Sequence, residues 1–132
     1  MQEFIQMATS QLGIGEDTAT TATGAVLKMV KAKLGDGDFG QLSAAVPGLA
    51  EMATGGSGGG GLGGLMGKAA GMLGGQAGGA AGLLGLVTSS GLSLDQAGSF
   101  VPLLFNFIKG KAGTDLFNTL VQKIPEIKGM LG

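Results

Sequence analysis

The chain of 132 residues has a formal net charge of −1, contains 29 glycines, and lacks both cysteine and histidine. All eight basic residues are lysines, so the arginine side chains and the positive field typical of nucleic-acid recognition are missing, and we expect no nucleic-acid partner. The absence of cysteine excludes disulfides and thiolate metal sites, and the absence of histidine removes the commonest acid–base catalyst near neutral pH. We therefore expect a protein that is not an enzyme, without catalytic residues, metal ligands or cofactors.

Residues 1–54 are predicted to form an N-terminal helical unit. After a short first helix, a second helix opens with Glu16 and its acidic neighbour, which suit the positive end of a helix dipole, and closes at Gly35. We expect Asp36 to cap a third helix, which Pro47 then ends.

The centre of the chain is rich in glycine. Residues 55–61, GGSGGGG, have the composition of a flexible linker. In residues 62–88 the glycines recur every three or four positions, the period of an α-helix, which predicts a helix with one bare stripe. The glycine stripe consists of Gly60, Gly64, Gly67, Gly71, Gly74, Gly78, Gly82 and Gly85. A neighbouring apolar ridge includes Leu62, Leu65, Met72 and Leu83.

Such a helix needs a packing partner. Each interior glycine costs about 0.8–1.0 kcal/mol relative to alanine, and ten of them cost on the order of 10 kcal/mol, which approaches the stability of a whole domain. Rows of small residues let two helices approach closely, so we expect the stripe to pack on another helix, in this chain or in a second copy. This favours a structural or interaction protein that forms a homo-oligomer or larger assembly. A disordered tether with accidental spacing is the alternative.

Residues 89–132 repeat the pattern of the N-terminal unit. At an offset of 78 positions, residues 13–52 align with residues 91–130 without a gap, and ten of the forty positions are identical. Ser93 and Gln96 predict a capping box, and Thr114 takes the place of Asp36 as the expected cap. The sequence therefore predicts an all-α domain of two three-helix units, related by a pseudo-twofold axis and joined through the glycine-striped helix.

Other polar patterns have simpler explanations than chemistry. Asp36 and Asp38 flank a glycine as in a calcium loop, but the closing glutamate of such a loop is absent, and a helix cap explains them. The lysine pairs near the ends of the two long helices suit the helix dipoles. The hydroxyls of residues 88–90 have no histidine base to activate them.

Two other functions stay open. A membrane-associating protein would insert residues 62–88 and let Lys68 reach the interface, although glycine and alanine supply little apolar area and Gln76 lies midway. A carrier of a small apolar ligand is the second alternative, because methionine-rich interiors adapt to such ligands. No particular small molecule is indicated.

Two stretches, GIGEDTATTATGAVLKMVKAKLGDGDFGQLSAAVPGL and GLSLDQAGSFVPLLFNFIKGKAG, flank the Gly/Leu/Ala-rich middle. Together with this middle segment, the two stretches resemble the proteobacterial VcgC/VcgE family, a domain of unknown function. The resemblance implies no activity, cofactor or catalytic residue. Because many similar proteins begin with an export signal, it implies a periplasmic or extracellular mature protein. Residues 1–12 lack the basic start and apolar run of such a signal, so a cytoplasmic location stays open.

Overall fold

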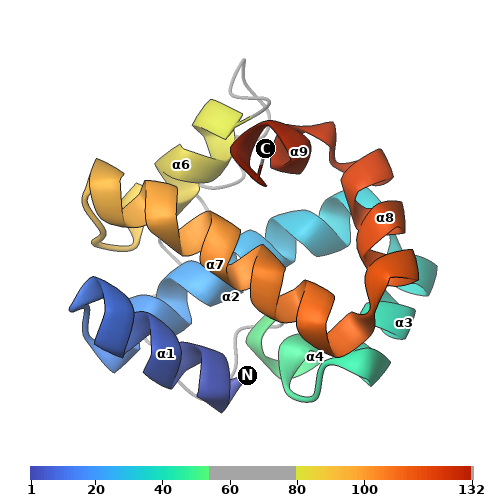
Figure 1. Ribbon diagram of the computed structural model, residues 1–132, viewed down its shortest axis with the longest axis horizontal. Helices are drawn as coiled ribbons and strands as arrows, with labels where there is room; N and C mark the ends of the chain where they lie inside the picture. The colour runs from blue at the N-terminus through green and yellow to red at the C-terminus, as the bar shows by residue number, and fades with distance from the viewer. Residues whose placement is uncertain (54–79, 132) are drawn as a thin grey trace.

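The computed structural model describes residues 1–53 and 80–131, and within them the chain forms α-helices joined by short turns and no strand (Figure 1). The prediction of an all-α protein is confirmed. In chain order the helices are α1 (Gln2–Leu12), α2 (Glu16–Leu34), α3 (Asp36–Ala45), α4 (Leu49–Ala53), α6 (Ala80–Ser89), α7 (Leu94–Ala112), α8 (Thr114–Lys123) and α9 (Pro125–Leu131).

Two long helices, α2 and α7, organise the molecule. The short helices α1 and α6 each contact both of them, and so do α3 and α8. Figure 1 shows α1 and α6 at one end of the long helices and α3 and α8 at the other. The remaining helices complete the sides, with α4 packed on α2 and α3, and α9 packed on α6, α7 and α8. Every helix therefore helps to enclose a single interior.

The turns after the two long helices depend on glycine where we expected a side-chain cap. The N–H of Gly35 donates to the Lys31 carbonyl at 2.9 Å and ends α2, and Gly35 is also the N-cap of α3. No side-chain hydrogen bond caps α3, so the prediction that Asp36 caps it is wrong. The same holds for Thr114, because Gly113 is the N-cap of α8. A φ of 83° at Gly35 and 90° at Gly113, which glycine adopts readily, turns the chain directly into the next helix.

The middle of α2 is buried on all sides. Residues 22–27 are all buried, which is the pattern of a helix surrounded by other elements. The hydroxyl of Thr23 is fully buried and donates to the Ala19 carbonyl at 2.6 Å, so its polar group is satisfied. A Cβ added to Gly24 would lie 3.0 Å from the Met52 carbonyl oxygen. Glycine at this position therefore lets α4 approach the backbone of α2.

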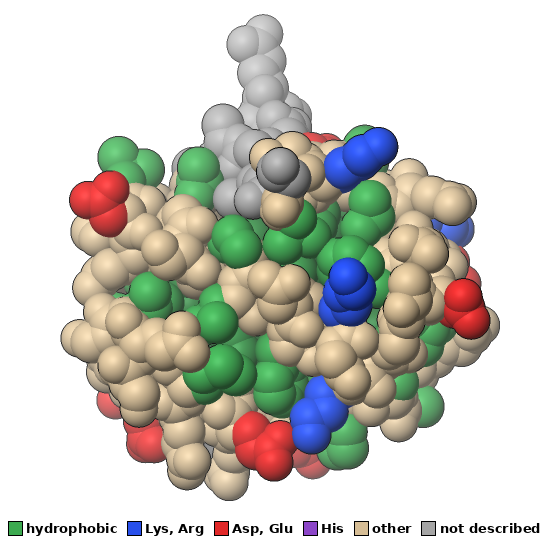
Figure 2. All heavy atoms as spheres, viewed as in Figure 1, with side chains coloured by type: hydrophobic (Ala, Val, Ile, Leu, Met, Phe, Trp, Pro, Cys, Tyr) green, Lys and Arg blue, Asp and Glu red, His purple; other side chains and the backbone are tan. Residues whose placement is uncertain are grey.

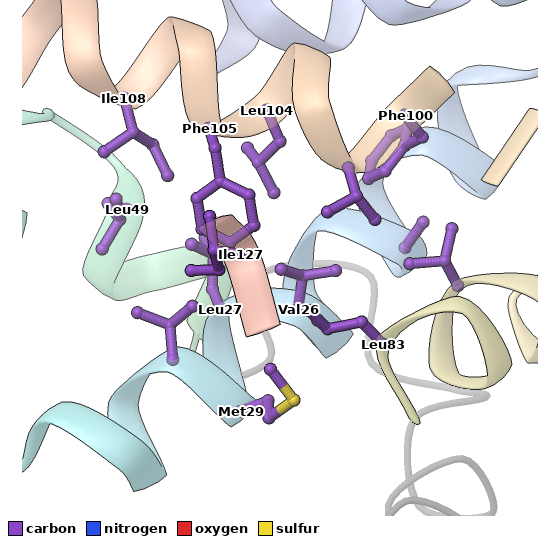
Figure 3. Packing of buried hydrophobic residues seen from close by; sticks show 14 of the residues in the cluster. Val26, Leu27, Met29, Leu49, Leu83, Phe100, Leu104, Phe105, Ile108 and Ile127 are labelled. Atoms are coloured by element: carbon purple, nitrogen blue, oxygen red, sulfur yellow. The ribbon is translucent and has the colours of Figure 1, made fainter. Parts of the chain in front are cut away.

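One hydrophobic core fills the space between the helices. Its buried members come from α1, α2, α3, α4, α6, α7 and α8 and the turns between them, together with Ile127 of α9. Figure 3 shows side chains of α7 pointing down onto those of α2, with Leu83 of α6 and Leu49 of α4 beside them. Phe100 and Phe105 are fully buried and are among the largest side chains in this core. The residues before and after the glycine-rich centre thus form one structural unit.

Part of the sequence prediction lies outside the described residues. This applies to the predicted linker at residues 55–61 and to residues 62–79 of the predicted striped helix. Leu49–Ala53, which follows the predicted end of the third helix at Pro47, forms a separate helix. Among the described residues, no helix has both the length and the apolar character needed to cross a membrane.

Candidate functional site

The described end of the glycine stripe lies within α6. Leu83 is fully buried, Gly82 is also buried, and Gly85 is half-buried. Because α6 packs on α2, α7 and α9, these residues belong to the interior of the fold. The other predicted interaction residues lie outside the described part of the chain: Gly60, Leu62, Gly64, Leu65, Gly67, Gly71, Met72, Gly74 and Gly78.

The three hydroxyls at the end of α6 are engaged with its backbone. Thr88 and Ser89 both donate to the Gly85 carbonyl, at 3.0 and 2.8 Å, and Ser90 donates to the Leu86 carbonyl at 3.2 Å. Serine and threonine hydroxyls in a helix commonly donate to the carbonyl three or four residues earlier, so these side chains are held against the helix backbone. The hydroxyls stabilise a helix end, and this arrangement does not activate a nucleophile.

The first lysine of each pair at the end of a long helix lies over an aromatic ring. Lys31 lies 5.9 Å from the centre of the Phe39 ring, and Lys109 lies 5.5 Å from that of Phe117. An ammonium over a ring face is attracted by the ring's quadrupole. Each contact ties the end of a long helix to the helix that follows it. The sequence carried a signal for these contacts, since both lysines precede a phenylalanine by eight positions.

The acidic residues that we considered for metal binding are not gathered into a site. Asp38 instead pairs with Lys123 at 3.1 Å across to α8. Within residues 1–53 and 80–131, no group of three or more acidic side chains is arranged to hold a metal ion.

A cavity of about 440 Å³ lies where the start of α1 meets the turn before α4 and the end of α7. Its lining consists of Met1, Gln2, Glu3, Val46, Pro47, Gly48, Phe107 and Lys111. It combines apolar walls with one ion pair, because Lys111 lies 3.0 Å from Glu3. The Lys111 ammonium, through its hydrogen bond and then its charge, holds the pKa of Glu3 below the ordinary value of 4.5. Sequence reasoning missed this cavity, because its walls come from three distant segments.

Few large hydrophobic side chains are exposed on the described surface. Only Leu94, at the start of α7, is strongly exposed among the large hydrophobic residues that the structure describes. Figure 2 shows further hydrophobic side chains in the middle of one face, where they lie between polar and charged ones. Partly buried hydrophobic residues, among them Leu103 and Phe107, pack against the core.

The described residues thus form an all-α protein, with one common core and with polar contacts at the helix ends. The chain belongs to the family described as Protein of unknown function VcgC/VcgE (DUF2780), whose profile matches residues 1–125. This confirms the resemblance drawn from the sequence. The chain matched none of the curated proteins with which it was compared. It matched none of the solved structures either.

Proposed function

We propose that this protein is a non-enzymatic structural or interaction protein, which self-associates or packs on a partner through its glycine-striped helix. The observation that supports this most directly is in α6, where the last part of the stripe is helical and Gly82 is buried. Gly24 gives a second example in the same fold, because its missing side chain admits the Met52 carbonyl. Glycine at helical spacing serves close approach in small-residue helix pairs generally.

We also propose that the fold is a duplication of one helical unit about a pseudo-twofold axis. At the offset of 78 positions, α2 (Glu16–Leu34) corresponds end for end to α7 (Leu94–Ala112), and α3 (Asp36–Ala45) to α8 (Thr114–Lys123). The helix contacts repeat as well: α1 packs on α2 and α7, and its counterpart α6 packs on α7 and α2. The lysine–phenylalanine contacts recur at the same offset. Gly24 corresponds to Pro102, so the two units differ at the middle of their long helices.

Leucine substitutions test the role of the stripe. Gly64→Leu with Gly74→Leu fills two positions of the stripe, and Gly63→Leu with Gly75→Leu makes the same change on neighbouring glycines outside it. Sedimentation velocity over a hundredfold range of concentration measures the mass of each variant. We expect wild type and the off-stripe variant to associate and the stripe variant to shift towards monomer. A wild-type protein that stays monomeric throughout, or two variants that associate equally, would contradict the proposal.

A carrier of a small apolar ligand is a second candidate, which the cavity beside α1 favours. Val46, Pro47 and Phe107 give it apolar walls, and a cavity of about 440 Å³ falls within the range of small-molecule sites. Phe107→Ala, with Leu103→Ala as the control outside the lining, tests it by titration with an apolar fluorescent dye. Binding that weakens severalfold only in the Phe107 variant supports a carrier, and equal binding by all three proteins contradicts it.

We further propose a periplasmic or extracellular location for the mature protein, which rests on the family resemblance alone. Fractionation of cells that produce the natural protein would place it, and recovery only with the cytoplasmic fraction would contradict this proposal.

A further inference from the structure

A lysine ammonium lies beside the apolar wall of the cavity next to α1. Phe107 and Lys111 are four residues apart in α7, so their side chains lie on the same face of the helix. The Lys111 ammonium lies 5.7 Å from the centre of the Phe107 ring, and both residues line the cavity. Val46 and Pro47, in the turn before α4, add to the apolar wall. The cavity therefore combines an apolar surface with a positive charge.

The carboxylate that pairs with this lysine is weakly held. Glu3 lies 3.0 Å from Lys111, but the Glu3 side chain is 73% exposed, whereas that of Lys111 is 45% exposed. Exposed ion pairs contribute little to stability. Glu3 also lies in the first turn of α1, where the helix dipole favours a carboxylate without help from Lys111. Glu3 can therefore turn into solvent and leave Lys111 to another anion.

The equivalent lysine in the other part of the chain has a carboxylate packed against it. At the offset of 78 positions, Lys111 corresponds to Lys33. Gly48, which lines the cavity, corresponds to Glu126. The Glu126 carboxylate lies 3.6 Å from the Lys33 ammonium, and the Glu126 side chain is only 18% exposed. Gly48 has no side chain that could reach Lys111, so at this lysine the cavity lies where the chain supplies no such carboxylate.

We propose that the cavity binds a small amphipathic anion, such as a medium-chain carboxylate, whose head replaces the Glu3 carboxylate on Lys111. Its apolar chain lies against Phe107, Val46 and Pro47. This inference rests on the proposal that the cavity carries a small apolar ligand. The lysine ammonium has three N–H donors, which suit a carboxylate head. A cationic head fits less well, because it would have to pair with Glu3 next to the Lys111 ammonium, which repels it.

Three probes with the same alkyl chain and different heads test this inference: octanoate, 1-octanol and octylammonium. Isothermal titration calorimetry with the full chain at neutral pH measures the binding of each probe. We expect the wild type to bind octanoate about tenfold more tightly than octylammonium, because only octanoate forms a charge-assisted hydrogen bond with Lys111.

Two variants change the head site in opposite directions. Lys111→Met keeps an unbranched apolar side chain and removes the charge, so octanoate should bind about tenfold more weakly while 1-octanol binds as before. Glu3→Gln removes the competing carboxylate, so octanoate should bind about threefold more tightly. Lys128→Met is the matched control, because it removes an exposed lysine of α9 outside the cavity lining and should leave the binding of both probes unchanged. Circular dichroism checks that each variant is folded.

Several results would overturn the inference. These are octanoate binding that Lys111→Met leaves unchanged or that Lys128→Met weakens equally, octanoate binding that is no tighter in the Glu3 variant, and a wild type that prefers octylammonium to octanoate. The wild type and the Glu3 variant decide the question even if the Lys111 variant does not fold.

The neutral probe separates this inference from the carrier proposal on which it rests. If 1-octanol binds to the wild type and octanoate binding does not depend on Lys111, the carrier proposal stands and the anionic head is wrong. If none of the three probes binds to the wild type, the carrier proposal fails as well.

Discussion

Lys109, in the last turn of α7, holds its ammonium 5.5 Å from the centre of the Phe117 ring in the next helix. Lys31 and Phe39 have the same relationship one unit earlier, at 5.9 Å. Each contact spans a glycine turn that leads into a helix with no side-chain cap, α3 or α8. The attraction between the lysine and the ring thus adds to the backbone hydrogen bonds that already join the two helices at the glycine turn.

We expect Lys109→Gln to lower the free energy of unfolding by about 0.5–1 kcal/mol, the range for exposed cation–π contacts. Lys128→Gln is the matched control, because Lys128 is an exposed lysine in the last turn of α9 and also loses a favourable charge at a helix end. Urea unfolding followed by circular dichroism measures both. An equal loss in the two variants would show that the ring contributes nothing.

Gly24 and Gly98 provide a paired test of close helix approach. Both lie inside long helices, but a Cβ on Gly24 would lie 3.0 Å from the Met52 carbonyl, whereas one on Gly98 would meet no atom within 4 Å. We expect Gly98→Ala to stabilise the protein by about 0.5–1 kcal/mol through helix propensity. We expect Gly24→Ala to destabilise it by about 1–2 kcal/mol, because α4 must move away. Thermal unfolding of both variants measures these changes, and a stabilised Gly24 variant would show that α4 yields without cost.

The sequence predicted the helices because their limits are local. Gly13, Gly35 and Pro47 disfavour continuation of a helix through their own backbone properties, and each lies within three residues of an observed helix end. The capping box of Ser93 and Gln96 is confirmed for the same reason, because both partners lie within one turn.

The contacts between residues 1–53 and residues 80–131 could not be predicted in this way. Phe4 meets Phe100 only because α1 crosses from one long helix to the other, and no periodicity specifies that crossing. The cap of α3 was misassigned because Asp36 has a suitable side chain, while the backbone of Gly35 already makes the turn. The role of Gly24 depends on α4, which lies 25 residues or more further along the chain, so no local pattern predicts it.

The ion pair between Glu3 and Lys111 gives the stability of the protein an acid dependence. The pKa of Glu3 is lowered in the folded state, first by the hydrogen bond from Lys111 and then by its charge. The pair therefore stabilises the fold above the ordinary glutamate pKa of 4.5, and its contribution is lost as the pH falls through the lowered value. Glu3 is exposed, so solvent screens this contribution.

We expect Lys111→Met to return the pKa of Glu3 towards 4.5, measured by NMR titration of the Glu3 carboxyl carbon. Lys128→Met removes an equal charge from α9 and serves as the control. A Glu3 pKa that is unchanged in the Lys111 variant, or that shifts as much in the control, would assign the lowering to another group.

The capping box of Ser93 and Gln96 at the start of α7 can be tested directly by substitution. The Gln96 N–H donates to the Ser93 hydroxyl at 3.2 Å, the Ser93 N–H donates to the Gln96 side chain at 3.0 Å, and the same side chain donates to Leu12. We expect Ser93→Ala to cost about 1 kcal/mol, the usual value for a lost N-cap. Thr114→Ala, at the start of α8, should change stability by less than about 0.5 kcal/mol, because Thr114 follows the N-cap and caps nothing. Urea unfolding of the two variants beside wild type compares them. If the Ser93 and Thr114 variants lose the same stability, Thr114 contributes to the start of α8 as strongly as Ser93 does to the start of α7. In that case Gly113 alone does not account for the turn before α8.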